Sequence, residues 1–103
     1  EVKAEENARW STPAYAITSG PVPFNGNTSI AVSLPDRADL ELSVFDVKGR
    51  LVKTIERGNF TKGLHHFNWN GRDTKGKLLS AGLYVYKVSA NNRVLVSKTI
   101  IAR

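Results

Sequence analysis

The chain contains no cysteine and only two histidines among its 103 residues. Without cysteine there is no disulfide framework, and no thiolate is present to act as a nucleophile or a soft metal ligand. No apolar run approaches the roughly 18 residues that a membrane-spanning helix requires. The first residues, which include Glu1, Glu5 and Glu6, do not resemble a secretory signal peptide. We therefore expect no membrane span, and if the protein is exported, this chain is a piece of a longer one.

Sequence motifs of catalysis and ligand binding are also missing. No glycine-rich loop ends in the Gly-Lys-Ser/Thr that cradles phosphate, and residues 73–77 lack the regularly spaced acids of a calcium loop. His65 and His66 are neighbours on a predicted strand, so they point to opposite faces and cannot share one metal ion. Asp46 and Asp73 could be imagined as a glycosidase pair, but each precedes a glycine by three residues, which is typical of a turn. We expect no catalytic residue, no cofactor and no metal site.

Positive charge is concentrated in one part of the chain. The net charge is +6, to which residues 1–14 contribute −1 and the remainder +7. Such a basic surface attracts polyanions, for example nucleic acid, lipopolysaccharide or an anionic membrane; the alternative is a soluble surface that is simply rich in lysine. The basic residues are scattered singly through predicted turns and strand ends, which argues against specific nucleic-acid recognition.

Apolar and polar residues alternate in a series of short segments, a pattern typical of half-buried strands. The alternation is clearest at 28–34, where Ile30, Val32 and Leu34 share one face. The same pattern predicts further strands at 15–17, 39–46, 51–56, 64–69, 83–90 and 94–101. Residues 58–63 are expected to form a loop, and Asn91-Asn92 a two-residue hairpin turn. Seven short strands without a long helix predict an all-β antiparallel sandwich, with a small closed barrel as the alternative.

The strand pattern sets the expected domain limits. Residues 1–14 are polar and lack alternation, so we interpret them as a linker or the tail of an upstream domain, in which Ala4 to Trp10 has room for a short helix. Residues 15–103 are expected to fold as one module. Trp10 lies outside the strand pattern and is most simply a clamp between linker and module.

The aromatic residues of the predicted strands admit two interpretations. Trp69, Tyr84 and Tyr86 fall on the faces that alternation assigns to the core, so we expect them to fill it. The alternative is an exposed platform on which sugars stack, lined by Trp10, Tyr15, Phe67, Trp69, Tyr84 and Tyr86.

Several motifs together resemble one known family. They run in this order: Pro23-Phe24-Asn25 with Thr28-Ser29-Ile30; residues 42–52 around Asp46, Gly49 and Arg50; Trp69-Asn70-Gly71-Arg72-Asp73 with Gly76; Gly82-Leu83-Tyr84-Val85-Tyr86; and Lys98-Thr99-Ile100-Ile101. On these motifs residues 21–103 resemble the C-terminal Ig-like modules of secreted bacterial proteins, the family related to the Ig-like domain of the flagellar hook-capping protein. They are also similar to the type A sorting domain of the type IX secretion system. Asn70 departs from the family, which usually has aspartate there.

The resemblance implies an Ig-like β-sandwich of about seven strands. The turns that would define this fold carry Asp46, Gly49, Arg50, Asn70, Gly71, Asp73 and Gly76. It also implies a non-catalytic, monomeric C-terminal module of a larger exported bacterial protein, which reaches the medium or the cell surface through the periplasm and outer membrane.

As a sorting domain, the module would be recognised by the outer-membrane translocon and then by a surface sortase that joins the cargo to anionic lipopolysaccharide. The expected partner-binding residues are Lys98 and Arg103, presented by a hairpin that Gly82 and Tyr84 shape. Two other functions stay open: an accessory polysaccharide-binding module of a secreted glycoside hydrolase or similar enzyme, and a passive spacer.

Overall fold

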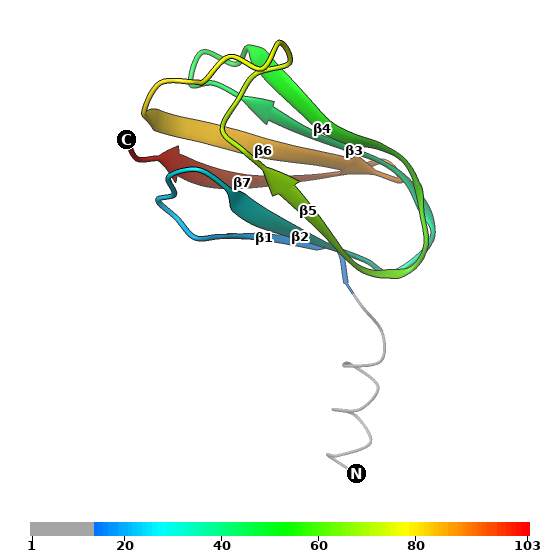
Figure 1. Ribbon diagram of the computed structural model, residues 1–103. Coiled ribbons are helices and arrows are strands. Elements are labelled where there is room, and N and C mark those ends of the chain that lie inside the picture. Colours follow the sequence, from blue (N-terminus) through cyan, green and yellow to red (C-terminus); the bar gives the residue numbers. More distant parts are fainter. Residues whose placement is uncertain (1–13) are drawn as a thin grey trace.

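A computed structural model describes residues 14–103, which form seven strands and no helix (Figure 1). The strands are β1 (Ala16–Gly20), β2 (Thr28–Leu34), β3 (Ala38–Phe45), β4 (Leu51–Phe60), β5 (Gly63–Trp69), β6 (Gly82–Ala90) and β7 (Arg93–Ile101). The predicted linker at 1–14, with its helix and the Trp10 clamp, lies outside the described residues except for Ala14. Within the described part, no helix has the length and apolarity needed to cross a membrane.

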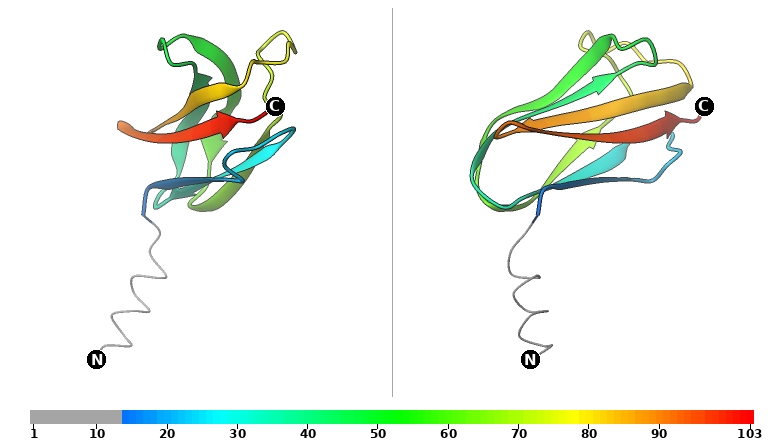
Figure 2. Two further views of the ribbon diagram at one scale, coloured as in Figure 1. Left: turned by 90° about the vertical axis from the view of Figure 1, so that its left-hand side faces the viewer. Right: turned by 180° about the vertical axis from the view of Figure 1, so that it is seen from behind.

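The strands form two antiparallel sheets that stack face to face (Figures 1 and 2). One sheet has the order β1-β2-β5 and the other the order β4-β3-β6-β7. The two sheets are joined at one edge by Phe24, whose amide donates to the Ile100 carbonyl at 2.9 Å and whose carbonyl accepts from the Ala102 amide at 2.8 Å. The predicted antiparallel sandwich is confirmed, and the closed barrel does not form.

The core lies between the sheets, where the alternation placed it. Ile30, Val32 and Leu34 are fully buried on the inner face of β2, and Trp69 is 2% exposed at the end of β5. The Trp69 ring makes edge contacts with the rings of Tyr84 and Tyr86, with centroids 5.9 Å apart in each case. These three rings therefore fill the core, as predicted, and form no exposed sugar platform.

The main departure from the predicted strands is the length of β4. A loop was expected at 58–63, but β4 continues to Phe60, so this prediction is wrong. Gly58 does not end the strand because its neighbours are fastened to β3. Arg57 pairs with Glu41 at 3.2 Å, and the Asn59 amide donates to Asp39 at 2.9 Å. Glycine weakens a strand but does not break it when the flanking cross-strand pairs are in place.

The hairpin between β6 and β7 has the two-residue turn that the sequence predicts. Asn91 and Asn92 have φ angles of 49° and 68°. Positive φ at both central positions is the geometry of a type I′ turn, which asparagine tolerates better than most residues. The two-residue turn aligns Ala90 with Arg93 and, at the other end of the hairpin, Gly82 with Ile101.

Candidate functional site

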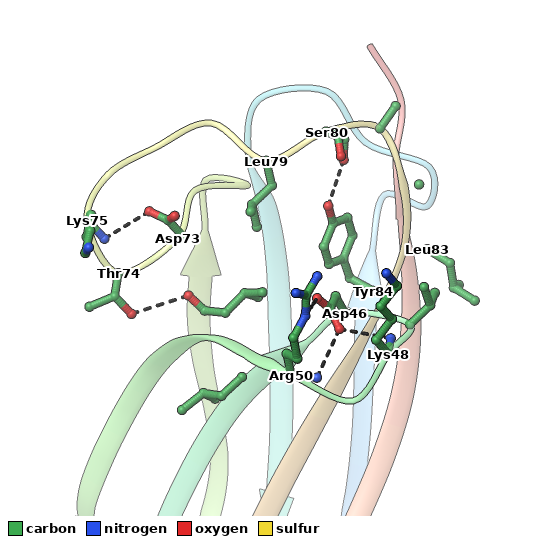
Figure 3. A pocket seen from close by; sticks show the side chains of 15 residues that line it. Asp46, Lys48, Arg50, Asp73, Thr74, Lys75, Leu79, Ser80, Leu83 and Tyr84 are labelled. Carbon is green, nitrogen blue, oxygen red and sulfur yellow. Dashed lines mark hydrogen bonds and ion pairs between the residues drawn. The ribbon is translucent and has the colours of Figure 1, made fainter.

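An open groove of about 680 Å³ lies at the end of the sandwich where the β3–β4 turn, the segment 73–84 and the start of β6 meet (Figure 3). Its lining includes the apolar side chains of Val52 and Leu79 and the two lysines Lys48 and Lys75. Five residues singled out from the sequence line this groove: Asp46, Arg50, Asp73, Gly82 and Tyr84.

Asp46 organises the turn on one side of the groove. One carboxylate oxygen accepts the backbone amides of Lys48 at 2.9 Å and Arg50 at 3.0 Å, and the other accepts the Arg50 side chain at 2.9 Å. The pKa of Asp46 is lowered, first by the hydrogen bond from the Arg50 amide, with partial opposition from desolvation. Gly49 closes the turn with φ of 82°. The carboxylate is thus occupied in holding its own loop.

Asp73 builds the same turn on the other side of the groove. One of its carboxylate oxygens accepts the amides of Lys75 and Lys77, each at 2.9 Å, and Gly76 has φ of 85°. The turn is also tied to β4, because the Thr74 amide donates to the Val52 carbonyl at 3.1 Å. Both aspartates therefore cap backbone amides, as the Asp-x-x-Gly spacing indicated.

The four residues expected to bind a partner do not form one cluster. Tyr84 is 6% exposed, and its hydroxyl donates to the Ser80 carbonyl at 2.9 Å (Figure 3). Arg103 donates from Nε to the Leu79 carbonyl at 2.8 Å, so it ties the end of the chain to the groove segment. Gly82 begins β6 with φ of 148°. Lys98, on β7, and Arg103 are exposed, and the role of all four in binding stays a prediction.

The histidines lie on opposite faces of β5, as their adjacency predicts. His65 is half-buried; its Nε2 lies 2.7 Å from the Thr61 carbonyl, and its ring packs against Phe60. His66 is exposed. Among residues 14–103, no three histidine or acidic side chains are grouped in a way that would hold a metal ion.

Sequence analysis missed an apolar surface on the outer face of the four-stranded sheet. We call it the outer patch; its members come from the ends of β3 and β6 and from β7, and they are Phe45, Leu83, Val85, Val96 and Ile100. Leu83, Val96 and Ile100 are 40%, 58% and 43% exposed. The signal for it is present in β7, where Val94, Val96 and Ile100 alternate with the inward Leu95 and Ile101, so that both faces of the strand carry apolar residues.

Two lysines stand within the outer patch. The Lys87 ammonium lies 5.8 Å from the centre of the Phe45 ring, and Lys98 is opposite Val85 in the register of β6 and β7. Neither lysine forms an ion pair among residues 14–103, in which the two ion pairs are Arg50–Asp46 and Arg57–Glu41. The patch thus combines exposed apolar area with unpaired positive charge.

Comparison with known proteins identifies relatives of the module. The model of the FlgD Ig-like domain matches residues 18–93. The basal-body rod modification protein FlgD of Salmonella typhimurium is 35% identical over 66 residues, which are 63% of this chain and 28% of that protein. The chain therefore spans little more than a quarter of this curated relative.

Two solved structures from Porphyromonas gingivalis share the fold at low sequence identity. Dimeric latent PorU superposes with a TM-score of 0.71 and 16% identity, over 87% of this chain and 9% of PorU. PorZ, described as an essential bacterial surface component of the type-IX secretion system, superposes with a TM-score of 0.58 and 17% identity, over 85% of this chain and 12% of PorZ. At such identities the likeness concerns the fold alone.

Proposed function

This chain belongs to the FlgD Ig-like domain family, and from that premise we propose that it is a non-catalytic docking module of a larger exported bacterial protein. The observation that carries the proposal is the use of the polar groups in and beside the groove. The carboxylates of Asp46 and Asp73, the hydroxyl of Tyr84 and the guanidinium of Arg103 all hydrogen-bond to the module's own backbone. A scaffold whose polar groups hold its own loops is suited to presenting a surface and not to transforming a substrate.

The finer proposal is that the module is a sorting domain of the type IX secretion system, recognised by the outer-membrane translocon and by surface sortase components. The fold shared with PorU and PorZ supports it, together with the exposed Lys98 on the last strand. Under this proposal the parent protein reaches the cell surface or the medium, and a basic surface aids its attachment to anionic lipopolysaccharide.

The test is a reporter with a signal peptide at its N-terminus and this chain at its C-terminus, produced in a bacterium with a type IX pathway. We expect the reporter at the cell surface, and in the periplasm when the translocon is absent. Lys98→Glu should reduce surface delivery, whereas Lys62→Glu, an equal charge change on an exposed loop residue, should not. A reporter that stays in the periplasm with the translocon present would reject the sorting function.

A second candidate is a role in flagellar rod or hook assembly. It is favoured by the 35% identity to the Salmonella rod modification protein, which is a closer sequence relationship than that to PorU or PorZ. The test replaces the matching 66 residues of the Salmonella protein with those of this chain in a strain that lacks the native gene. Restored flagellar assembly would support this role, and failure of a stably produced chimera would count against it.

A polysaccharide-binding function has less support from the site. Three of the rings proposed for a stacking platform, those of Trp69, Tyr84 and Tyr86, are in the core. Retention of the chain on insoluble polysaccharide would revive this function, and we expect the chain to pass through unretained.

A further inference from the structure

The outer side of β7 offers unpaired backbone groups next to the outer patch. The Ile100 carbonyl and the Ala102 amide point away from β6, since both bond to Phe24. Residues two apart in a strand point their amides and carbonyls to the same side, so those of Val94, Val96 and Lys98 also face away from β6. Within residues 14–103, only Phe24 makes backbone hydrogen bonds to this side of β7, and β1 lies beside it in the other sheet without pairing (Figure 2).

Two of the other three edge strands, β4 and β1, carry features that oppose strand addition, whereas β5 pairs with β2 without interruption. The pairing of β4 with β3 is interrupted by two register shifts, and irregular pairing discourages a further strand. The β1 edge is followed by Pro21 and Pro23, which cannot donate to a ladder. In contrast, β7 runs from Arg93 to Ile101 without proline, glycine or register shift. Lys98 is the one charged side chain between its ends.

A lysine on an edge strand has two possible roles. It can block the pairing of like edges, or it can select a partner with a carboxylate opposite it. The surroundings of Lys98 favour selection. Its neighbours along the outer face are apolar, and Lys87 on the adjacent strand adds a second unpaired positive charge within the patch. A strand laid against β7 would continue the outer patch and would find positive charge at its centre.

We propose that β7 binds an extended peptide segment by strand addition, and that this segment carries apolar side chains on its outer face with an acidic residue opposite Lys98. The segment pairs with the free amides and carbonyls of Val94, Val96 and Lys98. Its apolar side chains cover Val94 and Val96, while its carboxylate offsets the charge of Lys98. The proposal deepens the docking function above and rests on it, but its test measures binding to β7 directly and does not depend on secretion or flagellar assembly.

The test uses the full chain with a segment tethered after Arg103 by a flexible Gly/Ser linker, because a tether gives an effective concentration in the millimolar range. The acidic segment is Thr-Glu-Thr-Val-Thr-Val-Thr, and the basic control has lysine in place of glutamate. Amide hydrogen exchange is followed by NMR at Val94, Val96 and Lys98. The amides of Leu95 and Ser97 serve as internal references, because both face β6 and are protected in every variant.

In the unmodified chain, we expect the amides of Val94, Val96 and Lys98 to exchange fast. The acidic segment should slow the exchange of these amides about tenfold. The protection by the basic segment should be about threefold smaller than that by the acidic one, as expected for one cross-strand charge pair. Lys98→Glu should reverse this preference, and the matched Lys62→Glu should leave it unchanged.

Three outcomes would overturn the proposal: protection of these amides in the unmodified chain, no added protection with either segment, or equal protection by both. Dimerisation of the unmodified chain through β7 would also overturn it, by showing that a second copy occupies the edge. If the exchange experiment shows no strand addition but the chain still delivers a reporter, the module docks through another surface. The strand-addition proposal and the sorting proposal can therefore fail separately.

Discussion

Two tyrosines on one strand provide a test of the core, because removal of the Tyr84 hydroxyl should lower stability and removal of the Tyr86 hydroxyl should not. The Tyr84 hydroxyl donates to the Ser80 carbonyl at 2.9 Å. The Tyr86 hydroxyl is buried beside the hydroxyls of Thr99 and Thr28, but neither it nor the Thr99 hydroxyl makes a hydrogen bond of good geometry. Both rings touch Trp69 and project from the inner face of β6, so Tyr84→Phe and Tyr86→Phe make the same chemical change in similar surroundings.

The magnitudes follow from the hydrogen bonds. Tyr84→Phe should lower the free energy of unfolding by about 0.5–1.5 kcal/mol, the net value of a typical intramolecular hydrogen bond. Tyr86→Phe removes a buried group that has lost its hydration, so it should leave stability unchanged or raise it by about 1 kcal/mol. For a domain of this size, a change of 1 kcal/mol moves Tm by roughly 4–8 °C.

Alkaline pH adds a second readout for Tyr86. Burial raises the pKa of its phenol, and the hydroxyls of Thr99 and Thr28 offset only part of this rise. The unfolded chain therefore loses this proton at lower pH than the folded chain, so stability is complete below the unfolded pKa of about 10 and falls as pH rises above it. Tyr86→Phe should lose less stability above pH ~10 than the unmodified chain does.

Guanidinium unfolding followed by far-UV circular dichroism measures both changes. The denaturant dependence should be the same in all three proteins, so that a midpoint shift reports stability. The reasoning would be refuted if Tyr86→Phe destabilised the module by more than about 1 kcal/mol, since the hydroxyl would then have a partner, such as an internal water. A neutral Tyr84→Phe would refute the structural role of that hydroxyl.

Three further predictions concern the turns and are all measured by chemical or thermal unfolding. Asp46→Asn should destabilise the module near pH 7, and the difference should shrink below pH ~4, because the lowered pKa of Asp46 makes its contribution present above the unfolded pKa and lost as pH falls through the folded one. Gly71→Ala should cost more than Gly76→Ala: both have positive φ, but a Cβ at Gly71 would lie 3.1 Å from the Arg103 guanidinium, while that at Gly76 meets open space. Equal losses would place the cost in the backbone alone. Asn92→Gly should stabilise the hairpin by about 0.5 kcal/mol, and a loss would contradict the type I′ assignment.

Much of the fold could be predicted because its signals are local. Alternation fixes which side chains of β2 face inward, and the Asp-x-x-Gly spacing at Asp46 and Asp73 fixes two turns, which the structure confirms. The failure at 58–63 has a tertiary cause. Glycine disfavours the interior of a strand, so Gly58 predicts the end of a strand. The pairing of Arg57 and Asn59 with β3 overrides this local preference.

The site was harder to predict because it depends on distant segments. Arg103 lies on a basic tail in the sequence, and nothing local shows that it ties back to the carbonyls of Leu79 and Gly71. The outer patch likewise requires knowledge of which strands are neighbours, because Phe45 joins Val85 and Val96 only through the order β3-β6-β7. Single-sequence patterns report faces of strands, whereas a surface belongs to several strands together.

In the two aspartate turns, the side chains that hold the fold differ from those that are free for contact with other molecules. In each turn the aspartate and glycine are committed to the backbone, but the residue two places after the aspartate contributes only its amide, so the side chains of Lys48 and Lys75 are free at the groove rim. The same separation holds on β7, where Thr99 and Ile101 are buried and Lys98 is exposed between apolar neighbours. Substitution at such positions therefore alters the surface without touching the residues that hold the turns and fill the core, as a fold that carries different functions requires.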